Sequence, residues 1–508
     1  MEESIPHPSH RSKGASDFLS LRTDEAPAGG KAGWLADRIR AAVADRRLRP
    51  GDRLPAGRTL AADLGVSRGV VTEAYRRLLD DGLVVTAGRG GTVVAAAGAA
   101  VAHPPLRSPG SAAARADRQT PVTESRPGGL FGETSADVFT ALRAAPARFD
   151  LSPGLPDLTA FPRAAWMRAE RAVLDDLTPA AFGYGDPAGT PRLRAAVAGW
   201  LARFRGIAAD PDEIVIVAGV AQALALLARA LTRRGQHRIG VEDPGSLGAR
   251  RQLQHWGMTT VPVPVDRAGL RVDALRDSGA ATVLVSPAHE FPMGVVLDGT
   301  RRRDLTAWAA DGGLIVEDDY DAEHRYDRPP VTALRAAVPD RVCYTGSVSK
   351  ILAPALRIGW LLPPRDLLGE VIAAKREADL GNPALPQLVL ARLMDQGHLE
   401  SHLRMVRRRH RRRRDAMVDA LARHLPTATV HGAAAGLHLT VTLDAPPSAP
   451  VDDRVIAAAA LAAGVKVQPL SWHRIAPGAA GLVLGYAATP AGRIEEGVAA
   501  LAAVIGRA

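Results

Sequence analysis

The sequence predicts two unlike parts, a small basic helical module followed by a large α/β domain with a mainly parallel sheet. Residues 31–96 show apolar residues at helical spacing and end in a glycine-rich hairpin. Their twelve Lys or Arg residues against seven Asp or Glu residues give a net charge of about +5. From residue 149 to 508, short apolar strands alternate with helices. That alternation is typical of a parallel sheet with helices on both faces.

Length and composition exclude several classes of protein. A chain of 508 residues is long enough for two or three domains. The net charge of +10 and the pI near 10.2 favour a polyanionic partner. The single cysteine, Cys343, excludes a disulfide framework and a cysteine-based zinc site. No apolar run approaches the roughly 18 residues that span a bilayer, and the first residues are polar, so we expect a cytoplasmic protein without a membrane partner.

The first segments are a tail and a compact module. Residues 1–30 lack periodicity and are rich in Ser, Pro and Gly, which predicts a mostly disordered tail. In the module, the spacing of Trp34, Leu35, Ile39 and Val43 predicts a helix that ends before Arg49-Pro50-Gly51. We expect Thr59 to cap a second helix and Ser67 to cap a third, from Arg68 to Asp81, with Val71, Tyr75 and Leu78 on its inner face.

The module ends in a hairpin with basic residues at its edges. The runs Leu83–Thr86 and Thr92–Val94 flank a glycine-rich turn, so the whole predicts a winged helix-turn-helix. Arg58, Arg68 and Arg89 fall at two helix starts and at the hairpin tip, where such a module meets phosphates and base edges. The alternative is a solvated helical module whose arginines contact nothing specific.

The module closely resembles the GntR type of bacterial winged helix-turn-helix. The matching stretches are Pro50–Pro55, Leu60–Arg68 and Ala74–Leu78 with Asp81-Gly82. The resemblance implies that the module contacts operator DNA through six residues, namely Arg58, Ser67, Arg68, Thr72, Arg89 and Gly91.

Residues 97–148 are dominated by Ala, Pro, Ser, Arg and Gly, which predicts a flexible linker with a short helix over Ser135 to Ala145. A coil of about 50 residues spans roughly 40 Å, close to one turn of DNA. Such a linker allows two DNA-binding modules to reach separate half-sites.

A lysine near the middle of the large domain predicts its chemistry. Only five of the 64 basic residues are lysines, and Lys350 follows an apolar strand beside Ser347, Ser349 and Arg357. A desolvated amine can attack a carbonyl, whereas a guanidinium stays charged. Hydroxyls and a guanidinium together can bind a phosphate. The set indicates pyridoxal 5'-phosphate, and the alternative is an ordinary exposed lysine.

Other polar residues also follow predicted strands, where ligands collect in such folds. The carboxylates of Glu317–Asp321 allow a metal site, a solvated loop, or a carboxylate against a pyridinium nitrogen, with Tyr320 bonding the ring oxygen. Val220 and Ala221 open a helix whose free amides suit a phosphate. His289 is expected to be a hydrogen-bonded loop histidine rather than an acid or base, with a place in the pocket lining as the alternative, and no metal is expected.

Five stretches together resemble the MocR subfamily of GntR regulators, in which a fold-type-I aminotransferase domain replaces the effector domain. They are Tyr184–Gly189 with Leu193-Arg194, Glu242–Gly245, Ser286–Gly294, Glu317–Tyr326, and Gly346–Lys350 with Arg357. The resemblance implies a Schiff base at Lys350, with Asp318 on the pyridine nitrogen and Tyr320 on the ring hydroxyl. It implies a phosphate site made by Ser347, Ser349, Arg357, Val220 and Ala221. It also implies a homodimer, a large domain over about 180–370, and a small domain from 149–179 and 375–508.

Three features depart from this pattern or fall outside it. Ser246 stands where the family usually has an aromatic residue that stacks on the cofactor ring. The late strand Gly481–Tyr486 lacks the arginine that usually binds a substrate carboxylate. The arginine-rich run 407–414 is expected to be a solvated helix face, with a second DNA-binding patch as the alternative.

The favoured function is a transcriptional regulator that binds operator DNA and senses either pyridoxal phosphate or an amino compound. One alternative is a working aminotransferase with an accessory DNA-binding module. Another is a scaffold that has lost the cofactor.

Overall fold

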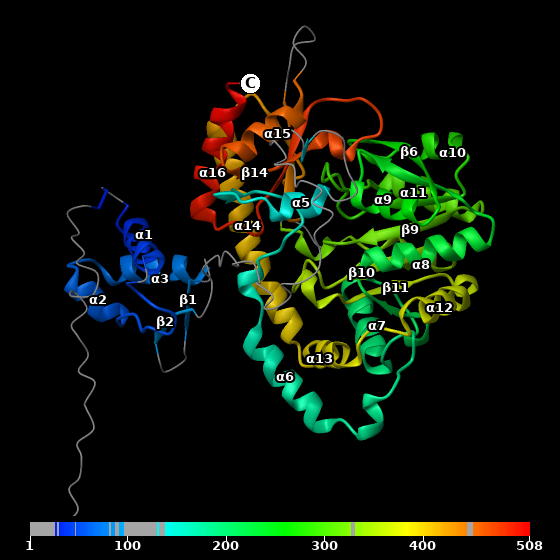
Figure 1. Cartoon of the computed structure of the whole chain (residues 1–508), viewed down its shortest axis with the longest axis horizontal. Coiled ribbons are helices and arrows are strands. Elements are labelled where there is room, and N and C mark those ends of the chain that lie inside the picture. The colour runs from blue at the N-terminus through cyan, green and yellow to red at the C-terminus, as the bar shows by residue number, and fades with distance from the viewer. Residues whose placement is uncertain are drawn as a thin grey trace, which may run out of the picture. The chain divides into compact units, whose positions relative to one another are not determined.

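The computed structural model describes residues 26–27, 30–45, 47–80, 83–86, 91–95, 130–131, 138–326, 331–443 and 451–507. The chain divides into two compact units, Met1–Val122 and Thr123–Ala508, which are considered separately below (Figure 1). Most of the predicted tail and of the predicted linker lies outside the described residues.

The first unit has the predicted winged helix-turn-helix order. It consists of α1 (Lys31–Ala44), α2 (Gly57–Asp63), α3 (Arg68–Asp80), β1 (Val84–Thr86) and β2 (Thr92–Val94). The two strands are antiparallel, with Val84 opposite Val94. The predicted inner face of α3 is buried. One expectation is wrong. Thr59 does not cap α2, because the chain leaves the Arg53–Val93 bridge and enters the helix at Gly57, after Ala56.

The second unit is built on an eight-stranded sheet in the order β4-β11-β10-β9-β8-β5-β6-β7. The five central strands β10, β9, β8, β5 and β6 are parallel, and β4, β11 and β7 extend the sheet with antiparallel pairs β10–β11, β11–β4 and β6–β7. The strands are β4 (Val215–Val217), β5 (Arg238–Asp243), β6 (Thr259–Asp266), β7 (Gly269–Leu270), β8 (Thr282–Val285), β9 (Leu314–Asp319), β10 (Val342–Ser347) and β11 (Gly359–Leu362). The mainly parallel sheet predicted from the sequence is confirmed.

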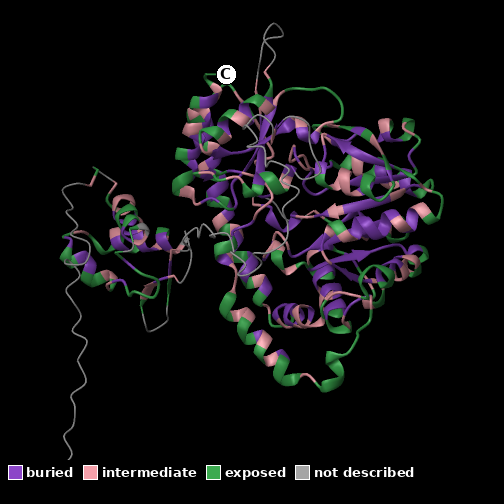
Figure 2. Cartoon of the chain, in the orientation of Figure 1, coloured by how far each residue is buried: buried purple, intermediate pink, exposed green. Residues whose placement is uncertain are grey.

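Helices cover both faces of this sheet, and its strands are accordingly buried (Figures 1 and 2). Neighbouring residues alternate between the faces. Val316 packs with one set of helices and Ile315 with the other. The first face is covered by α8 (Val220–Arg233), α9 (Leu247–His255) and α12 (Arg365–Asp379). The second is covered by α7 (Pro191–Arg205), α10 (Val272–Asp277), α11 (Gly299–Ala310), α13 (Ala384–Asp395) and part of α14 (His398–His424). Against α13 lies α6 (Arg163–Asp176).

A smaller α/β layer contains a four-stranded antiparallel sheet in the order β12-β13-β16-β15. Its strands are β12 (Thr429–His431), β13 (His438–Thr442), β16 (Gly481–Gly485) and β15 (Gln468–Pro469), next to the parallel pair β3 (Phe149–Asp150) and β14 (Val465–Lys466). Its core includes residues of α14, α15 (Asp453–Ala462) and α16 (Ala491–Ile505).

Part of the predicted linker belongs to this core. The short helix expected near residue 140 is present as α5 (Val138–Ala144). Val138 and Leu142 of α5 are buried, and Phe131 stacks on Trp472 at a ring distance of 5.3 Å. These apolar side chains reach an aromatic partner more than 300 residues away in sequence, so the segment is not flexible linker up to residue 148.

The arginine-rich run lies on α14, and its members divide between core and surface. Arg408, Arg411 and Arg412 are exposed, but His410, Arg413 and Arg414 are buried. Arg409 and Arg413 each pair with the buried Asp157 at 3.0 Å. The expectation of a wholly solvated face is therefore wrong, because Asp157 provides a buried partner. Although α14 has 27 residues, neither it nor any other helix in the described ranges is long and apolar enough to cross a membrane.

A buried ion pair lies under the sheet. Arg205, the last residue of α7, is 2% exposed and contacts Asp319 at 2.5 Å. Burial raises the pKa of Asp319, and Arg205 opposes that rise. The neighbouring Glu317 is fully buried and accepts the backbone N–H groups of Leu334 at 2.9 Å and Arg335 at 3.0 Å.

Replacing Arg205 by Met should destabilise the second unit by about 3–5 kcal/mol, because Asp319 is left as an unpaired buried charge. Urea unfolding measures this loss, which should be larger at pH 8 than at pH 5. The unpaired carboxyl has a raised folded-state pKa, so the folded state gains stability as the carboxyl is protonated. The matched control is Arg203→Met, since Arg203 is exposed and pairs with Glu400 at 3.1 Å. That change should cost less than about 1 kcal/mol. Equal losses in the two variants would contradict the assigned role of Arg205.

Candidate functional site

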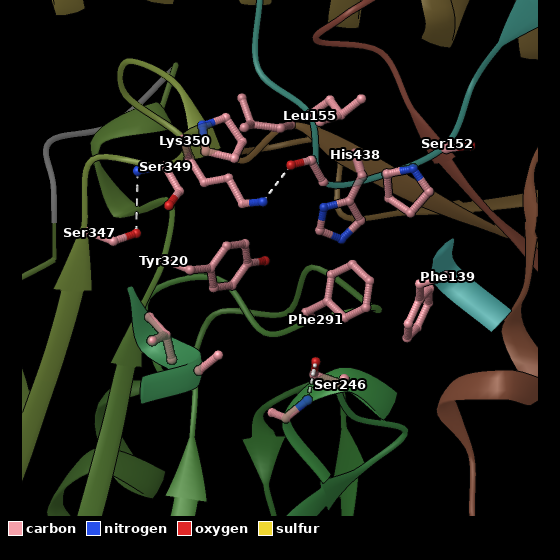
Figure 3. Close-up of a pocket in the computed structure, with 18 of the residues that line it drawn as sticks. Phe139, Ser152, Leu155, Ser246, Phe291, Tyr320, Ser347, Ser349, Lys350 and His438 are labelled. Carbon is pink, nitrogen blue, oxygen red and sulfur yellow. Dashed lines mark hydrogen bonds between the residues drawn. The ribbon is translucent and has the colours of Figure 1, made fainter. Parts of the chain in front are cut away.

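A cavity of about 1010 Å³ lies at the carboxyl ends of β9 and β10. It is lined by residues of the large sheet, of the start of α8 and of the smaller layer, including Phe139 of α5 and His438 of β13 (Figure 3). The carboxyl ends of parallel strands are where ligands bind in open α/β folds.

Lys350 extends into this cavity from the turn after β10 (Figure 3). Its Nζ donates a hydrogen bond to the carbonyl oxygen of Gly154. Loss of water around the amine lowers the pKa of Lys350, and the carboxylates of Asp321 and Asp318 oppose that shift. A lysine with a lowered pKa has a larger fraction of neutral, nucleophilic amine.

Asp318 reaches the cavity because of the alternation along β9. Glu317 and Asp319 are turned to the opposite face, toward Arg205, whereas Asp318 lines the cavity. Thr345, its neighbour on β10, donates to Asp318 at 3.3 Å. Burial, with a contribution from Asp319, raises the pKa of Asp318 to about 7. A protonated ring nitrogen nearby would favour the charged carboxylate.

Tyr320 also lines the cavity, and its hydroxyl group lies 3.0 Å from Nδ1 of His289. The same Nδ1 lies 2.9 Å from Oδ2 of Asp321. His289 is not among the residues that line the cavity, so the alternative of pocket lining is wrong, whereas a hydrogen-bonded loop histidine agrees with these contacts. It lies behind Tyr320, because the backbone of Gly436 and Gly294 leaves space for its ring there.

The acidic run 317–321 is therefore not a solvated loop, and its carboxylates do not converge as ligands of one metal ion. One metal-like grouping is nevertheless present among the described residues, with atoms of His289, Asp321 and His438 within 4.8 Å of one another. Hydrogen bonds already use two of the histidine nitrogens. His289 Nδ1 bonds Asp321, and His438 Nε2 lies 3.2 Å from the carbonyl oxygen of Pro292.

The five residues predicted to bind a phosphate all line the same cavity: Ser347, Ser349, Arg357, Val220 and Ala221. Helix α8 begins at Val220 after Gly219, which has a φ of 83°. A Cβ at Gly219 would lie 3.2 Å from Nη1 of Arg357, so this glycine allows the guanidinium to approach the helix start. Arg357 has a φ of 50° and donates to the carbonyl oxygen of Ala218. Backbone amides, hydroxyls and a guanidinium thus converge on one end of the cavity.

Ser246, which replaces the usual aromatic residue, has a local structural role. Its hydroxyl accepts the backbone N–H of Ala249 at 3.2 Å and caps α9, and it lines the cavity. The late strand β16 is buried, and Val483 at its centre is fully buried. Among the described lining residues the arginines are Arg357 and Arg143 of α5.

Several lining residues were not identified from the sequence. They include Phe139, Gly154, Phe291, His438, Gln468 and His473. Only Phe291 carried a signal, since it lies within the stretch Ser286–Gly294. The others come from segments far from Lys350 in sequence, and packing alone brings them to the cavity. Burial lowers the pKa of both His438 and His473 to about 3, so both rings are neutral near pH 7.

In the first unit, three of the predicted DNA-contacting residues line one surface hollow of about 610 Å³: Arg58, Arg68 and Thr72. All three are exposed, as are Ser67 at the start of α3 and Gly91, which has a φ of 82°. The hydroxyl group of Tyr75 donates to the carbonyl oxygen of Pro55 at 2.8 Å and ties α3 to the chain before α2. Arg89 lies outside the described residues.

Both units match known families. The model described as "Bacterial regulatory proteins, gntR family" matches residues 32–94, and that of "Aminotransferase class I and II" matches residues 150–500. The chain is 34% identical to the HTH-type pyridoxine biosynthesis transcriptional regulator PdxR of Corynebacterium glutamicum, covering 89% of this chain and 91% of the relative. It is 32% identical to the probable rhizopine catabolism regulatory protein MocR of Rhizobium meliloti, covering 92% of each.

Solved structures resemble the second unit. The kynurenine aminotransferase of Pyrococcus horikoshii has a TM-score of 0.66 and 27% identity, over 73% of this chain and 93% of that one. An archaeal alanine:glyoxylate aminotransferase has a TM-score of 0.68 and 27% identity, over 75% and 97%. With a GntR-type winged helix-turn-helix and an aminotransferase-like domain in one chain, this protein belongs to the MocR subfamily of GntR transcriptional regulators.

Proposed function

We propose that this regulator holds pyridoxal phosphate at Lys350 and that a ligand in the cavity changes its affinity for operator DNA. The observation that carries the proposal is the placement of Lys350, Asp318 and Arg357 around one cavity. This arrangement provides an amine of lowered pKa, a half-buried carboxyl and a cation at a helix start.

The residues present fit this cofactor group by group. When bound, pyridoxal phosphate supplies an aldehyde for a covalent bond to a lysine and a ring that carries a nitrogen and a hydroxyl. Lys350 would provide the amine, and Asp318 would accept a hydrogen bond from the protonated ring nitrogen. Tyr320 would donate to the ring oxygen. Ser347, Ser349, Arg357 and the amides at Val220 and Ala221 would bind the phosphate.

Two ligand classes suit the cavity as effectors, the cofactor itself and an amino compound that reacts with the bound cofactor. The relative from Corynebacterium glutamicum is named for the regulation of pyridoxine biosynthesis, which supports the first class. The likeness of the second unit's fold to two solved aminotransferases supports the second.

The covalent bond should form at Lys350 and at neither of the other two lysines of the second unit. Lys375 is held by Asp379 at 2.7 Å and Lys466 by Asp150 at 3.2 Å, so their amines are engaged. Borohydride reduction of the protein loaded with pyridoxal phosphate, followed by peptide mass spectrometry, should place the adduct on Lys350. Lys350→Ala should lose the near-ultraviolet to visible absorbance of the bound cofactor. An adduct on Lys375 or Lys466 would contradict the assignment.

We also propose that Arg58, Ser67, Arg68, Thr72, Arg89 and Gly91 contact operator DNA. The exposed guanidinium groups of Arg58 and Arg68 share one hollow beside α3, the helix that enters the major groove in such modules. Glu73, whose pKa is lowered to about 2 by Arg76 and Arg77, stays ionised and holds those two arginines along α3.

Replacing Arg68 by Ala should weaken specific operator binding by about 1–3 kcal/mol if its guanidinium reads a base. The matched control is Arg77→Ala on the same helix. A Cβ at Gly33 would lie 3.1 Å from Nη1 of Arg77, so this arginine lies against α1. Fluorescence anisotropy with operator and scrambled duplexes should show a specific loss only for Arg68→Ala, with the cofactor spectrum unchanged in both variants. A larger loss for Arg77→Ala would contradict the proposed docking face.

Coupling between ligand and DNA is proposed to pass through α5. Phe139, Leu142 and Arg143 of this helix line the cavity. The residues between β2 and α5 connect the two units along the chain. A ligand that contacts α5 therefore acts on the element next to the connection. A homodimer would present two DNA-binding modules whose spacing such contacts can change.

Phe139→Ala should reduce the change in operator affinity caused by ligand at least several-fold and leave ligand-free operator affinity unchanged. The control is Ala141→Ser, an exposed neighbour on the same helix. Operator titrations with and without pyridoxal phosphate measure the effect, and DNA must change the affinity for the ligand by the same factor. Sedimentation of the same samples should give twice the 53.4 kDa of one chain. An unaltered ligand response in Phe139→Ala would overturn the role of α5.

A further inference from the structure

Tyr320 is supported from behind by a buried histidine and a buried aspartate. His289 and Asp321 are each only 1% exposed. The Nδ1 atom of His289 lies 3.0 Å from the Tyr320 hydroxyl oxygen and 2.9 Å from Oδ2 of Asp321. A single ring nitrogen therefore contacts both the tyrosine of the cavity and a carboxylate outside it.

The carboxylate of Asp321 determines which atom donates the hydrogen in each of these hydrogen bonds. An ionised carboxylate only accepts hydrogen bonds, so Nδ1 of His289 must carry the hydrogen. Because this N–H is shared between Asp321 and Tyr320, the tyrosine oxygen acts as an acceptor on that side. The hydrogen of the Tyr320 hydroxyl is then free to point into the cavity. With the hydrogen on Nε2 instead, Tyr320 would donate to Nδ1 and lose this role.

The surrounding backbone holds the imidazole in place. A Cβ at Gly436 would lie 2.0 Å from Cε1 of His289 and 2.8 Å from Oδ2 of Asp321. A Cβ at Gly294 would lie 3.0 Å from Nε2 of His289. Both glycines have positive φ, 81° and 68°, which other residues rarely adopt. Nε2 of His289 is buried and has no hydrogen-bond partner among the residues that the structure describes, so the ring is fixed through Nδ1.

We propose that His289, oriented by Asp321, is a positioning residue that keeps Tyr320 as a hydrogen-bond donor to the ring oxygen of the cofactor. The inference rests on the proposed function, because it requires pyridoxal phosphate in the cavity. Burial, together with Asp321, Glu290, Asp318 and Glu242, raises the pKa of Tyr320 well above its usual value. The phenol therefore keeps the hydrogen that it donates. On the cavity side, the cationic side chains of the described lining are Lys350, Arg357 and Arg143.

The hydrogen bond from Tyr320 to the ring oxygen should affect the pH dependence of the bound cofactor's absorbance. A donor to the ring oxygen stabilises its negative charge, so the loss of that donor shifts the midpoint of the absorbance change to higher pH. Tyr320→Phe is the reference variant, with an expected upward shift of about one pH unit for the loss of one hydrogen bond to a charged acceptor.

His289→Leu should shift the midpoint in the same direction as Tyr320→Phe. His289→Asn should keep it near that of the parent, because the asparagine amide places an N–H donor close to the position of Nδ1. The double variant with His289→Leu and Tyr320→Phe should shift no further than Tyr320→Phe alone. Urea unfolding of every variant, compared with that of the parent, reports whether the second unit is folded.

A parent-like midpoint in His289→Leu, or an additive shift in the double variant, would overturn the proposal. If the parent itself shows no cofactor absorbance, the proposed function has failed first and the inference falls with it. A second measurement does not need the cofactor and applies even if the variants do not bind it. It is nitrogen NMR of ligand-free protein with labelled histidines. His289, assigned by the signal missing from His289→Asn, should carry its hydrogen on Nδ1. A hydrogen on Nε2 would also overturn the proposal.

Discussion

The ion pair between Arg205 and Asp319 is the constraint on which the second unit depends. Strand β9 carries three consecutive carboxylates into the middle of the sheet, and the next residues add Tyr320 and a further carboxylate. Burying such a run without a cation would leave several unpaired charges, each costing several kcal/mol. Arg205 at the end of α7 supplies that cation from the face opposite the cavity. Helix α7, β9 and the cavity are therefore linked by one electrostatic requirement.

The alternation of side chains along β9 divides this acidic run between different tasks. Glu317 and Asp319 lie on the core face of the sheet. Glu317 accepts hydrogen bonds from two backbone amides, and Asp319 pairs with Arg205. Asp318 lines the cavity and accepts a hydrogen bond from Thr345. Asp321 lies beyond the strand and orients His289. A shift of the strand by one residue would place Asp318 against Arg205 and turn Asp319 to the cavity, so the register that stabilises the core also positions the site.

The sequence predicted what is local, and packing determined the rest. Ser347, Ser349, Lys350 and Arg357 lie within eleven residues of one another after one strand, so spacing alone indicated a shared site. Asp318 was predictable because parallel strands end at the same edge of a sheet. Phe139, His438 and Gln468 reach the cavity from the smaller layer and carry no local signal. The arginine-rich run was expected to be solvated because its buried partner, Asp157, lies about 250 residues earlier in the sequence. Nothing in the local sequence indicates that pairing. Thr59 failed as a cap because the helix begins two residues earlier, at Gly57 after Ala56.

The opposite wall of the cavity explains how an aminotransferase fold can serve a regulator. Residues that suit the cofactor line the cavity, while the late strand β16 contributes no arginine to the described lining. His438 and His473 on that wall are neutral near pH 7, because burial lowers the pKa of each to about 3. The other arginine of the lining, Arg143, lies on α5. An anionic group on an amino ligand would therefore meet its cation on the helix next to the connection to the DNA-binding module. The proposed coupling through α5 is consistent with this placement of Arg143, because the same helix lines the cavity and packs in the core of the smaller layer.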